Sequence, residues 1–327
     1  MSKKLSVITV CRNAAKSIEK CVRSVIEQSY RPIEYILIDG ASTDQTPAII
    51  QKYYDHIAVL VSEPDDGIYS AMNKGLLHAT GDLVYFINAD DYLVDKHVLA
   101  DVAGFIETHP DADVYYGSIE IRDEDGAKLV VVPDSPDKAS EFLVCGCLPH
   151  QATFARRPVF ERTGLFDERY RRHADYDWFL KVVADPEMRL VRFNRTVAFF
   201  NLDGASSQLA LGQPEVYRIQ NSSPLYQSDG WSRRRIEILQ SALLASRIEN
   251  AELKRQLRGA IRESRVTFKG TLRPFNSIKC WFMDFIGLQA LGSLRALRRY
   301  LSPELLINAY RQRRAKLRGA GSRRERD

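Results

Sequence analysis

A repeated alternation of short apolar segments with segments of helical period constrains the fold of this chain more than any other feature. Residues 5–11 are apolar and β-branched, and apolar side chains then recur over 18–25 at the i, i+3, i+4, i+7 spacing of a helix with one buried face. The alternation continues with strands predicted at 33–38, 57–61, 83–87 and 114–116, and with helices predicted from 46, over 68–78 and over 95–109. Short links between alternating elements predict an α/β fold, with a Rossmann-like, mostly parallel sheet and helices on both of its faces.

The alternation breaks after residue 117. Two short apolar segments around Asp125-Gly126 predict a hairpin. Residues 203–230 are rich in Ser, Gln, Gly and Pro, which is typical of a linker, and residues 233–261 have a charged helical pattern. Beyond the hairpin, strands are predicted at 152–154 and 190–200 and helices over 157–163 and 176–184. We therefore expect an α/β domain over 1–215, a linker and charged helical region over 216–270, and a helical C-terminal extension over 271–327.

Residues 81–91, GDLVYFINADD, combine a buried strand with a polar exit. The apolar run is typical of a central strand, and Asn88, Asp90 and Asp91 follow it directly. In open α/β sheets, ligands bind outside the carboxyl ends of the strands, which is where these side chains would lie. Carboxylate and amide oxygens suit Mg²⁺ or Mn²⁺, which bridge protein carboxylates to substrate phosphates. The alternative is that the two aspartates merely lead into the helix that begins near Asp95.

Size and composition favour a soluble, cytosolic protein. The chain has 327 residues, 45% of them hydrophobic and 27% charged, which is enough apolar material for a sizeable core. Its five cysteines form neither a paired framework nor a complete zinc pattern, so we expect reduced thiols. The N-terminal segment MSKKLSVITV runs directly into a strand pattern without a cleavage site, and no window has the ~18 uninterrupted apolar residues of a membrane span.

Polar groups also follow the other predicted strands. Thr9 and Arg12 belong to the end of the first strand, and Asp39 ends the second. A second acidic pair, Asp175 and Asp177, lies at the start of a predicted helix. Each of these residues has a structural alternative, as a turn residue, a helix N-cap or a first-turn carboxylate that favours the helix dipole.

In this order, the segments resemble the successive motifs of glycosyltransferase family 2. The matching stretches are SVITVCRNAAKSIEKCVRSVIEQSY, IEYILIDGASTDQT, NKGLLHATGDLVYFINADD and GLFDERYRRHADYDWFLK, and the resemblance spans residues 5–205. Several motifs in the same order are more specific than any one of them. The chain is similar above all to bacterial members that build surface and exported polysaccharides, in which a His-Gln strand like PHQATF, residues 149–154, precedes the acidic helix. The resemblance implies the GT-A fold and an inverting, metal-dependent transferase that uses nucleotide sugars.

The resemblance also assigns roles by position. It implies nucleotide binding by Thr9, Asp39 and Asp66, a metal motif at Asn88 and Asp90 with Asp91 adjacent, and general-base catalysis by Asp175. From the residues themselves, Arg12 and Asn88 are further candidates for nucleotide binding, and His150, Asp177, Gly204 and Ser206 are candidates for substrate contacts. For His150 the alternative is an ordinary structural histidine on a strand. Asn88 departs from the family's DXD motif, because an uncharged amide replaces the first carboxylate. We therefore expect weaker metal binding than two carboxylates would give.

The implied chemistry explains these residue types. A hydroxyl of the acceptor attacks the anomeric carbon while a nucleoside diphosphate leaves from the opposite face, which inverts the anomeric centre. A divalent cation, Mn²⁺ or Mg²⁺, on Asp90 would stabilise the charge on the departing phosphates. Asp175 would accept the proton of the acceptor hydroxyl. The expected partners are a UDP-linked sugar donor and a saccharide or lipid-linked acceptor of surface polysaccharide biosynthesis.

The positive charge of the chain is concentrated in its C-terminal tail. The net charge is +5, but residues 270–327 hold 13 Lys and Arg against 4 Asp and Glu, a local +9, which leaves −4 for the first 269 residues. Apolar residues at near-helical spacing lie beside arginines in this tail: Trp281, Phe282, Phe285, Ile286, Leu288, Leu291, Leu294 and Leu297 with Arg295, Arg298 and Arg299. Such a helix suits a membrane interface and predicts a peripheral protein on the cytoplasmic face of the cell membrane. The alternative is a helix packed on the catalytic domain or on another subunit of a homo-oligomer.

Two other functions fit parts of the sequence. A sugar-nucleotide nucleotidyltransferase shares the α/β sheet, but it needs a Gly-rich, basic loop after the first strand, and residues 11–14, CRNA, are not such a loop. An RNA-binding protein would account for the basic tail, but the arginines lie beside long apolar faces and the strands carry no aromatic stacking motif. We therefore expect no nucleic-acid partner.

Overall fold

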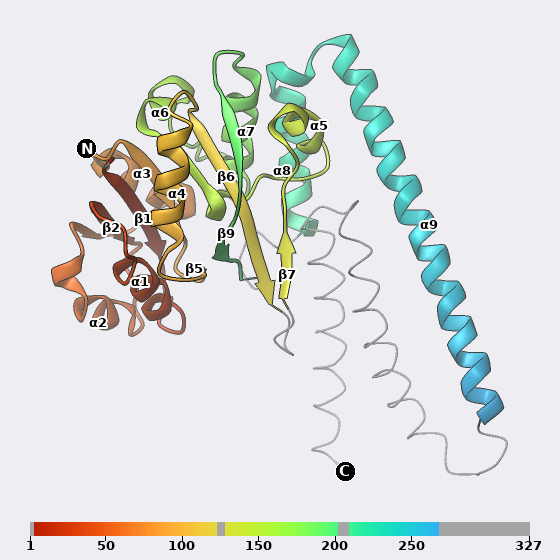
Figure 1. Ribbon diagram of the computed structural model, residues 1–327, viewed down its shortest axis with the longest axis horizontal. Coiled ribbons are helices and arrows are strands. Elements are labelled where there is room, and N and C mark those ends of the chain that lie inside the picture. Colours follow the sequence, from red (N-terminus) through yellow and green to blue (C-terminus); the bar gives the residue numbers. More distant parts are fainter. Residues whose placement is uncertain (1–2, 123–127, 202–208, 268–327) are drawn as a thin grey trace. The chain divides into compact units, whose positions relative to one another are not determined.

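The computed structural model describes residues 3–122, 128–201 and 209–267 (Figure 1). The described residues fall into two compact units, one formed by the chain up to residue 143 together with 147–231, and one formed by 144–146 together with 232–267. The first unit is an α/β domain, and the described part of the second is dominated by one long helix. The tail over 271–327, and with it the predicted membrane helix, lies outside the described residues.

Four parallel strands form the first half of the sheet. They lie in the order β3-β2-β1-β4 and are β1 (Leu5–Cys11), β2 (Ile33–Asp39), β3 (Val59–Ser62) and β4 (Leu83–Phe86). In this register Leu5 lies between Ile33 on one side and Leu83 on the other. Because the strands are parallel, their carboxyl ends meet at one edge of the sheet, as the alternation predicted.

The second half of the sheet is mixed. Strand β8 (Thr153–Arg156) runs antiparallel to β4, and β6 (Val114–Arg122), β9 (Leu190–Phe199) and the short β5 (Tyr92–Leu93) continue the sheet. β6 is parallel to β9 but antiparallel to β8 and to β7 (Lys128–Val131), with which it forms the predicted hairpin. A short link permits only an antiparallel pair, so the hairpin interrupts the parallel order. The α/β class is confirmed, with a parallel half and a mixed half.

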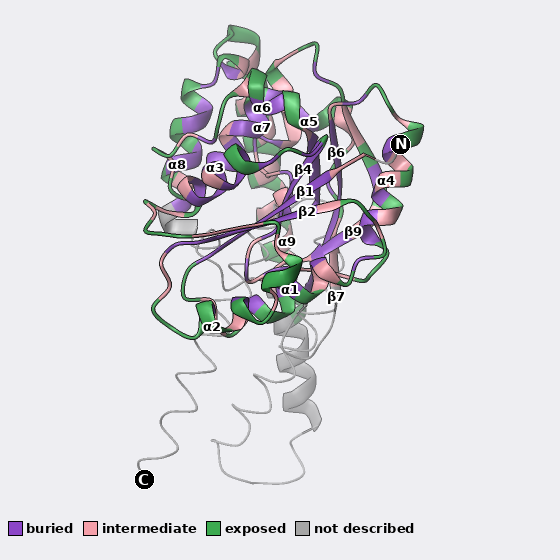
Figure 2. Cartoon of the chain, turned by 90° about the vertical axis from the view of Figure 1, so that its left-hand side faces the viewer, coloured by how far each residue is buried: buried purple, intermediate pink, exposed green. Residues whose placement is uncertain are grey.

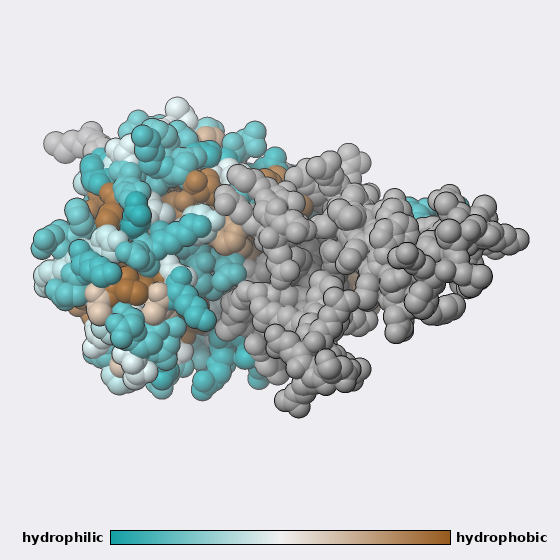
Figure 3. Space-filling view, turned by 90° about the horizontal axis from the view of Figure 1, so that it is seen from below, coloured by the Kyte–Doolittle hydropathy of each residue, from teal (hydrophilic) through white to brown (hydrophobic). Residues whose placement is uncertain are grey.

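One face of the sheet is covered by α1 (Ile18–Ile26), α2 (Thr46–Gln51) and α4 (Val98–Thr108). Their apolar side chains share one core with the odd-numbered residues of β1, and the buried positions of α1 are those that the helical spacing predicted. Figure 2 shows the strands buried between helices whose outer sides are exposed. The face in Figure 3 is mainly hydrophilic where it is coloured, with a few separate apolar patches.

The opposite face carries α3 (Ile68–His78), α6 (Arg157–Thr163) and α7 (Ala174–Ala184). A Cβ atom on Gly75 of α3 would lie 2.4 Å from the side chain of Ile8, so only glycine lets this helix lie so close to β1. Helices α6 and α7 pack together through stacked aromatic rings 5.0 Å apart. Short elements complete the first unit: η1 (Tyr54–His56), η2 (Pro136–Lys138), α5 (Ala139–Phe142), η3 (His150–Ala152) and η5 (Pro224–Tyr226).

The segment over 203–230, predicted to be a linker, contains helix α8 (Leu209–Ser222). Val216 and Ile219 are buried three residues apart on this helix, so the segment has an apolar face despite its polar composition. Gln220 donates a hydrogen bond to a tyrosine hydroxyl of α7 at 2.7 Å. The linker prediction was wrong for this stretch, because packing against α7 stabilises a helix that composition alone does not favour.

Helix α9 (Asp229–Thr267) contains the charged helical region predicted over 233–261. An ion pair between Arg234 and Glu237 links charged residues one turn apart. Among the side chains of this helix that the structure describes, Ile236, Leu239, Leu243, Leu244 and Ile248 are large, aliphatic and exposed. In the part of the chain that the structure describes, no helix combines the length and the apolar character needed to cross a membrane.

Candidate active site

The exit of β4 and the entry to β8 meet at the carboxyl edge of the parallel strands. Tyr85 of β4 lies opposite Phe154 of β8 in an antiparallel pair, so the residues after β4 lie beside those before β8. Asn88 therefore faces His150, and Nδ2 of the amide lies 3.2 Å from Nε2 of the imidazole. Strand pairing thus brings together two predicted site residues that are 62 positions apart in sequence.

Asp175 receives a hydrogen bond on each of its carboxylate oxygens. It lies in the first turn of α7 and is 9% exposed. Tyr69, in the first turn of α3, donates its hydroxyl to Oδ1 at 2.7 Å, and Nδ1 of His150 lies 3.1 Å from Oδ2. Burial pushes the pKa of Asp175 up, but the hydrogen bond and charge of His150, the charge of His173 and the bond from Tyr69 outweigh it, and the pKa lies below its usual value. The side chain is therefore a charged, proton-accepting carboxylate at neutral pH.

Asn88, His150, Asp175 and Tyr69 form one continuous chain of hydrogen bonds. Nδ1 of His150 donates to the Asp175 carboxylate, and the opposite ring nitrogen, Nε2, contacts the amide nitrogen of Asn88. Burial, and then the charge of Asp175, raise the pKa of the Tyr69 hydroxyl, so this group remains a donor. Sequence reasoning missed Tyr69, because a tyrosine on the buried face of a helix is normally a core residue.

Asp177 does not join this chain. Side chains two residues apart on an α-helix point in directions that differ by about 200°, so Asp177 points away from Asp175. Its carboxylate pairs with the ammonium group of Lys181, one turn further along α7, at 2.8 Å. The structure therefore separates two aspartates that the local sequence does not distinguish.

Asp90 and Asp91 lie directly beyond β4 in a poorly solvated environment. Burial raises the pKa of Asp90, and burial followed by the charge of Asp90 raises the pKa of Asp91. Oδ1 of Asp91 accepts a hydrogen bond from the backbone N–H of Asn201 at 2.9 Å. Oδ2 of Asp91 and Oδ1 of Asn88 are buried and have no hydrogen-bond partner among the described residues. The hydrogen bonds from the backbone of Asn201 and from the side chain of Gln151 oppose this rise in the pKa of Asp91.

These oxygens fit the ligands of a hard divalent cation. Unpartnered oxygens and carboxylates with raised pKa values are what a bound cation would satisfy and neutralise. Within the described ranges, no group of three or more His, Cys, Asp or Glu side chains could hold a metal ion by itself. Asn88, Asp90 and Asp91 could therefore provide only part of a coordination shell, which phosphate oxygens and water would complete.

Asp39 is held at the end of β2 by hydroxyl groups. It is 1% exposed, and its carboxylate accepts hydrogen bonds from Oγ of Ser42 at 2.5 Å and Oγ of Ser62 at 2.6 Å. The thiol of Cys11 lies 3.6 Å from Oδ1, and burial followed by the charge of Asp39 raises the pKa of this thiol, which stays protonated. These contacts fix the orientation of the Asp39 carboxylate at the same edge of the sheet as Asn88.

Arg12 and Asp65 meet at Gly40, just beyond the ends of β1 and β2. A Cβ atom on Gly40 would lie 2.2 Å from Oδ2 of Asp65 and 3.4 Å from Cδ of Arg12, so a larger residue would clash here. Asp66, which the resemblance selected, is exposed, and its neighbour Asp65 is half-buried. Sequence reasoning missed Asp65, because two adjacent aspartates before a glycine carry no signal that separates them.

Thr9 lies in the core and not at the rim of the site. Its side chain is fully buried, and its hydroxyl accepts a hydrogen bond from the hydroxyl of Tyr35 at 3.1 Å. On the other side it contacts Sγ of Cys21 at 3.8 Å. Side chains alternate along a strand, and Thr9 shares its face with the other odd-numbered core residues of β1. The structure therefore does not bring the Thr9 side chain together with the other predicted site residues.

Helix α8 holds the turn that leads into α7. The carboxylate of Glu215 accepts hydrogen bonds from the backbone N–H groups of Arg171, at 2.7 Å, and Arg172, at 2.8 Å. A Cβ atom on Gly212 would lie 2.3 Å from the ring of His173, the N-cap residue of α7. The predicted linker thus includes a helix that sets the position of the helix carrying Asp175.

Comparison with known proteins identifies the family of this chain. The family model described as "Glycosyl transferase family 2" matches residues 6–164. A Mycobacterium bovis protein described as a PGL/p-HBAD biosynthesis glycosyltransferase is 30% identical over 226 residues, which cover 67% of this chain and 85% of the relative. The chain belongs to glycosyltransferase family 2. Membership of this family makes the protein a glycosyltransferase and favours glycosyl transfer over the nucleotidyl transfer considered from the sequence.

Solved structures show the fold of this family 2 chain. S. aureus TarS in complex with UDP-GlcNAc matches with a TM-score of 0.56 at 21% identity, over 72% of this chain and 71% of that one. The mannosyltransferase PcManGT of Pyrobaculum calidifontis, solved with GDP-Man and Mn²⁺, matches with a TM-score of 0.53 at 17% identity, over 96% of this chain and 86% of that one. These likenesses confirm the predicted GT-A fold. Of the predicted site residues of this family 2 enzyme, Gly204 and Ser206 lie outside the described residues.

Proposed function

We propose that this enzyme transfers a sugar, with inversion, from a UDP-linked donor to a hydroxyl group of a saccharide or lipid-linked acceptor in surface polysaccharide biosynthesis. The observation that carries the proposal is the position of Asp175, which is buried yet charged and is linked through His150 to Asn88 at the exit of β4. The UDP-GlcNAc bound to TarS and the glycosyltransferase description of the mycobacterial relative are consistent with such a donor and reaction.

Asp175 has the properties of a general base for the acceptor. Hydrogen bonds from Tyr69 and His150 occupy two of the roughly four lone-pair sites of its carboxylate, which leaves others for an incoming proton. Asp175 would accept the proton of the acceptor hydroxyl while the hydroxyl oxygen attacks the anomeric carbon. The nucleoside diphosphate would leave from the opposite face of the sugar, so the configuration at this carbon inverts.

The exit of β4 would hold a divalent cation, Mn²⁺ or Mg²⁺. Asp90 is its principal ligand in this proposal, and Asp91 and the Oδ1 atom of Asn88 provide further oxygens nearby. A cation bound there supplies Lewis-acid stabilisation of the negative charge on the diphosphate leaving group. Because Asn88 is uncharged, metal affinity in the absence of nucleotide is expected to be low.

Asp39 would bind the nucleoside of the donor, together with Arg12 and the neighbouring Asp65 and Asp66. The hydroxyl groups of Ser42 and Ser62 hold the Asp39 carboxylate in one orientation, as recognition of a nucleoside by hydrogen bonds requires. We assign no contact to the buried side chain of Thr9.

The basic tail over 271–327 would hold the enzyme at the cytoplasmic face of the cell membrane. Its local charge is +9 from residue 270 onward, and attraction to anionic lipid contributes ~1 kcal/mol for each Lys or Arg close to the surface. Apolar residues of the same tail would add burial in the interface. A lipid-linked acceptor would be accessible from this position.

The proposal is tested with a panel of nucleotide sugars and with Mn²⁺ or Mg²⁺. We expect one UDP-sugar to be hydrolysed slowly without acceptor and transferred faster with a saccharide or lipid-linked acceptor. Proton NMR of the product should show an anomeric configuration opposite to that of the donor. A product that retains the donor configuration would contradict the assignment of Asp175 as a base for direct displacement.

A further inference from the structure

Glu215 is a buried acidic side chain on α8, a helix that lies beyond residues 6–164, the part of the chain that the family model matches. It is 5% exposed, and no lysine or arginine side chain of the described residues pairs with it. Its carboxylate accepts instead the backbone N–H groups of Arg171, at 2.7 Å, and Arg172, at 2.8 Å. A buried carboxylate is costly unless hydrogen bonds satisfy it, and bonds to a charged acceptor are about twice as strong as neutral ones. Glu215 therefore holds the turn before α7 firmly.

Arg172 is held on both sides of its backbone. Its N–H donates to Glu215, and its carbonyl oxygen lies 2.9 Å from the hydroxyl of Tyr69. The same hydroxyl donates to Oδ1 of Asp175 at 2.7 Å. A hydroxyl group has a single hydrogen, so the carbonyl of Arg172 and the carboxylate of Asp175 compete for it, and the charged carboxylate is the stronger acceptor. The strength of the bond to Asp175 therefore depends on where the turn places the carbonyl of Arg172.

His173 provides a second link between Glu215 and the proposed base. Its Nδ1 atom lies 3.4 Å from Oε2 of Glu215, so the two side chains form an ion pair when the imidazole is protonated. The ring is buried and lies against Gly212, which is on the same helix as Glu215. The charge of His173 is one of the causes that lower the pKa of Asp175. Glu215 thus contacts both the turn and His173, and each of these acts on Asp175.

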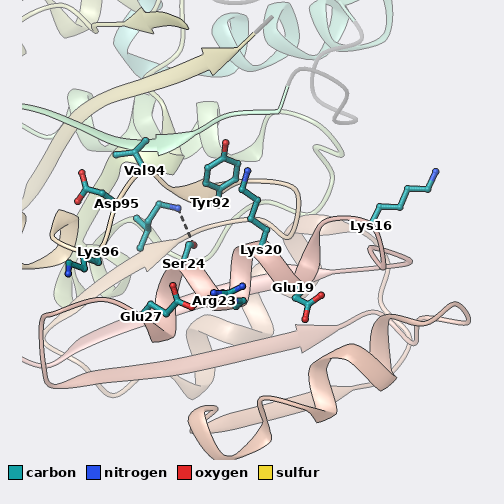
Figure 4. Close-up of a pocket in the computed structure, with 11 residues that line it drawn as sticks. Lys16, Glu19, Lys20, Arg23, Ser24, Glu27, Tyr92, Val94, Asp95 and Lys96 are labelled. Atoms are coloured by element: carbon teal, nitrogen blue, oxygen red, sulfur yellow. Dashed lines mark hydrogen bonds and ion pairs between the residues drawn. The ribbon is translucent and has the colours of Figure 1, made fainter. Parts of the chain in front are cut away.

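The titratable side chains that act on the Asp175 carboxylate come from three elements and are His150 of η3, Tyr69 of α3 and His173 at the N-cap of α7. Further along α7, Asp177 pairs with Lys181 and points away from this group. The pocket in Figure 4 lies between α1 and the segment that follows the exit of β4, on the face of the sheet opposite α7, and contributes no side chain to it. Glu215 is therefore the charged group through which α8 reaches the proposed base.

We propose that Glu215 is a positioning residue for the general base, Asp175. It fixes the turn over 171–173, and through this turn it sets how Tyr69 and His173 meet the carboxylate. This role rests on the proposed function of Asp175 as the base for the acceptor. Without the Glu215 carboxylate, the N–H groups of the turn lose their acceptor, the turn shifts, and the Tyr69 hydroxyl gives less of its hydrogen to the base. Because this hydrogen bond and the charge of His173 both lower the pKa of Asp175, weakening them raises that pKa.

Glu215→Gln in the full chain tests the proposal, because glutamine keeps the shape of the side chain but accepts hydrogen bonds with only one of its two terminal atoms. We expect kcat at neutral pH to fall by about 10- to 100-fold, since misplacement of a catalytic group by roughly 1 Å can cost this much. The acid limb of the pH–kcat profile should move to higher pH, whereas donor binding, measured by titration, should not change. Glu161→Gln, the same substitution at an exposed residue of α6, is the control and should leave all three measurements unchanged.

A double-variant cycle separates positioning of the base from a general structural role. Added to Asp175→Asn, Glu215→Gln should cause no further loss of kcat, because a residue that acts through the base has nothing to act on once the base is removed. An equal fold-loss in both backgrounds, or an unmoved acid limb in the single variant, would overturn the proposal. If circular dichroism shows that Glu215→Gln does not fold, Glu215→Asp, which keeps both acceptor oxygens on a shorter side chain, replaces it in the same cycle. An unchanged kcat in Asp175→Asn alone would refute the proposed base itself, whereas independent losses would refute only the role of Glu215.

Discussion

The imidazole of His150 forms a hydrogen bond with the carboxylate of Asp175. Nδ1 of His150 lies 3.1 Å from Oδ2 of Asp175. The opposite ring nitrogen lies 3.2 Å from the amide of Asn88 at the exit of β4. One side chain therefore links the proposed base to the proposed donor and metal site. Any change in the position of His150 should affect both.

Replacing Asp175 by asparagine should lower the turnover number by about 10²–10⁴, which is the usual contribution of a general base. Asparagine keeps the size of the side chain but cannot accept the proton of the acceptor. Donor binding, measured by titration, should change little. Asp177→Asn is the matched control, because Asp177 pairs with Lys181 on another side of the helix. Greater loss of turnover in the control than in Asp175→Asn would reverse the two assignments.

His150→Gln should move the acid limb of the pH–kcat profile to higher pH. His150 lowers the pKa of Asp175 by its hydrogen bond and its charge, whereas burial acts in the opposite direction. Without His150 the largest opposition to burial is lost, so the pKa of Asp175 rises and the base becomes protonated at a higher pH. A change in KM with an unmoved acid limb would mean that His150 is a substrate contact and does not position Asp175.

Asp90→Ala should abolish metal-dependent donor binding and leave the fold intact. Mn²⁺ binding in the presence of UDP, measured by electron paramagnetic resonance, is a readout that does not require turnover. Asn88→Asp should be tolerated and should tighten Mn²⁺ binding, because it adds a negative charge beside an oxygen that is unpartnered in the described structure. A folded Asp90→Ala protein with normal Mn²⁺ binding would refute the metal assignment.

Gly212→Ala should destabilise the protein by ~1–3 kcal/mol and lower kcat, because the added methyl group would lie 2.3 Å from the ring of His173. The displaced α8 would disturb the turn that leads to Asp175. Gly104→Ala is the control: its Cβ would meet no atom of the described residues within 4 Å, and in the middle of α4 it should stabilise the helix by ~0.5–1 kcal/mol. Denaturant unfolding and kinetics of both variants check the prediction.

Deleting residues 271–327 should release the protein from anionic liposomes without abolishing donor hydrolysis. Attraction between the basic tail and anionic lipid is screened by salt, so binding of the full chain should also weaken between low and high ionic strength. Co-sedimentation of both proteins with liposomes measures the effect. A full-length protein that stays in the supernatant at low salt would show that the tail serves assembly with protein and not membrane attachment.

Local patterns in the sequence determined the elements of the first unit. Helix α3 has the predicted bounds, 68–78, and the buried residues of α1 are those of the predicted spacing, because periodicity reports directly which side of an element faces a core. The polar exit after β4 and the acidic start of α7 could be located for the same reason. Parallel strands place their carboxyl ends together, so the alternation also indicated which edge of the sheet carries the site.

Only the tertiary structure decided how the site is assembled. The contact between Tyr69 and Asp175 joins residues 106 positions apart, and its existence depends on the packing of α3 and α7 on one face of the sheet. Helix α8 forms because Val216 and Ile219 are buried, although the composition of its segment is typical of a linker. Thr9 lies in the core because its side chain is on the same face of β1 as those of the other odd-numbered residues, which are buried there. Each of these outcomes depends on long-range burial, which residue types and local spacing do not encode.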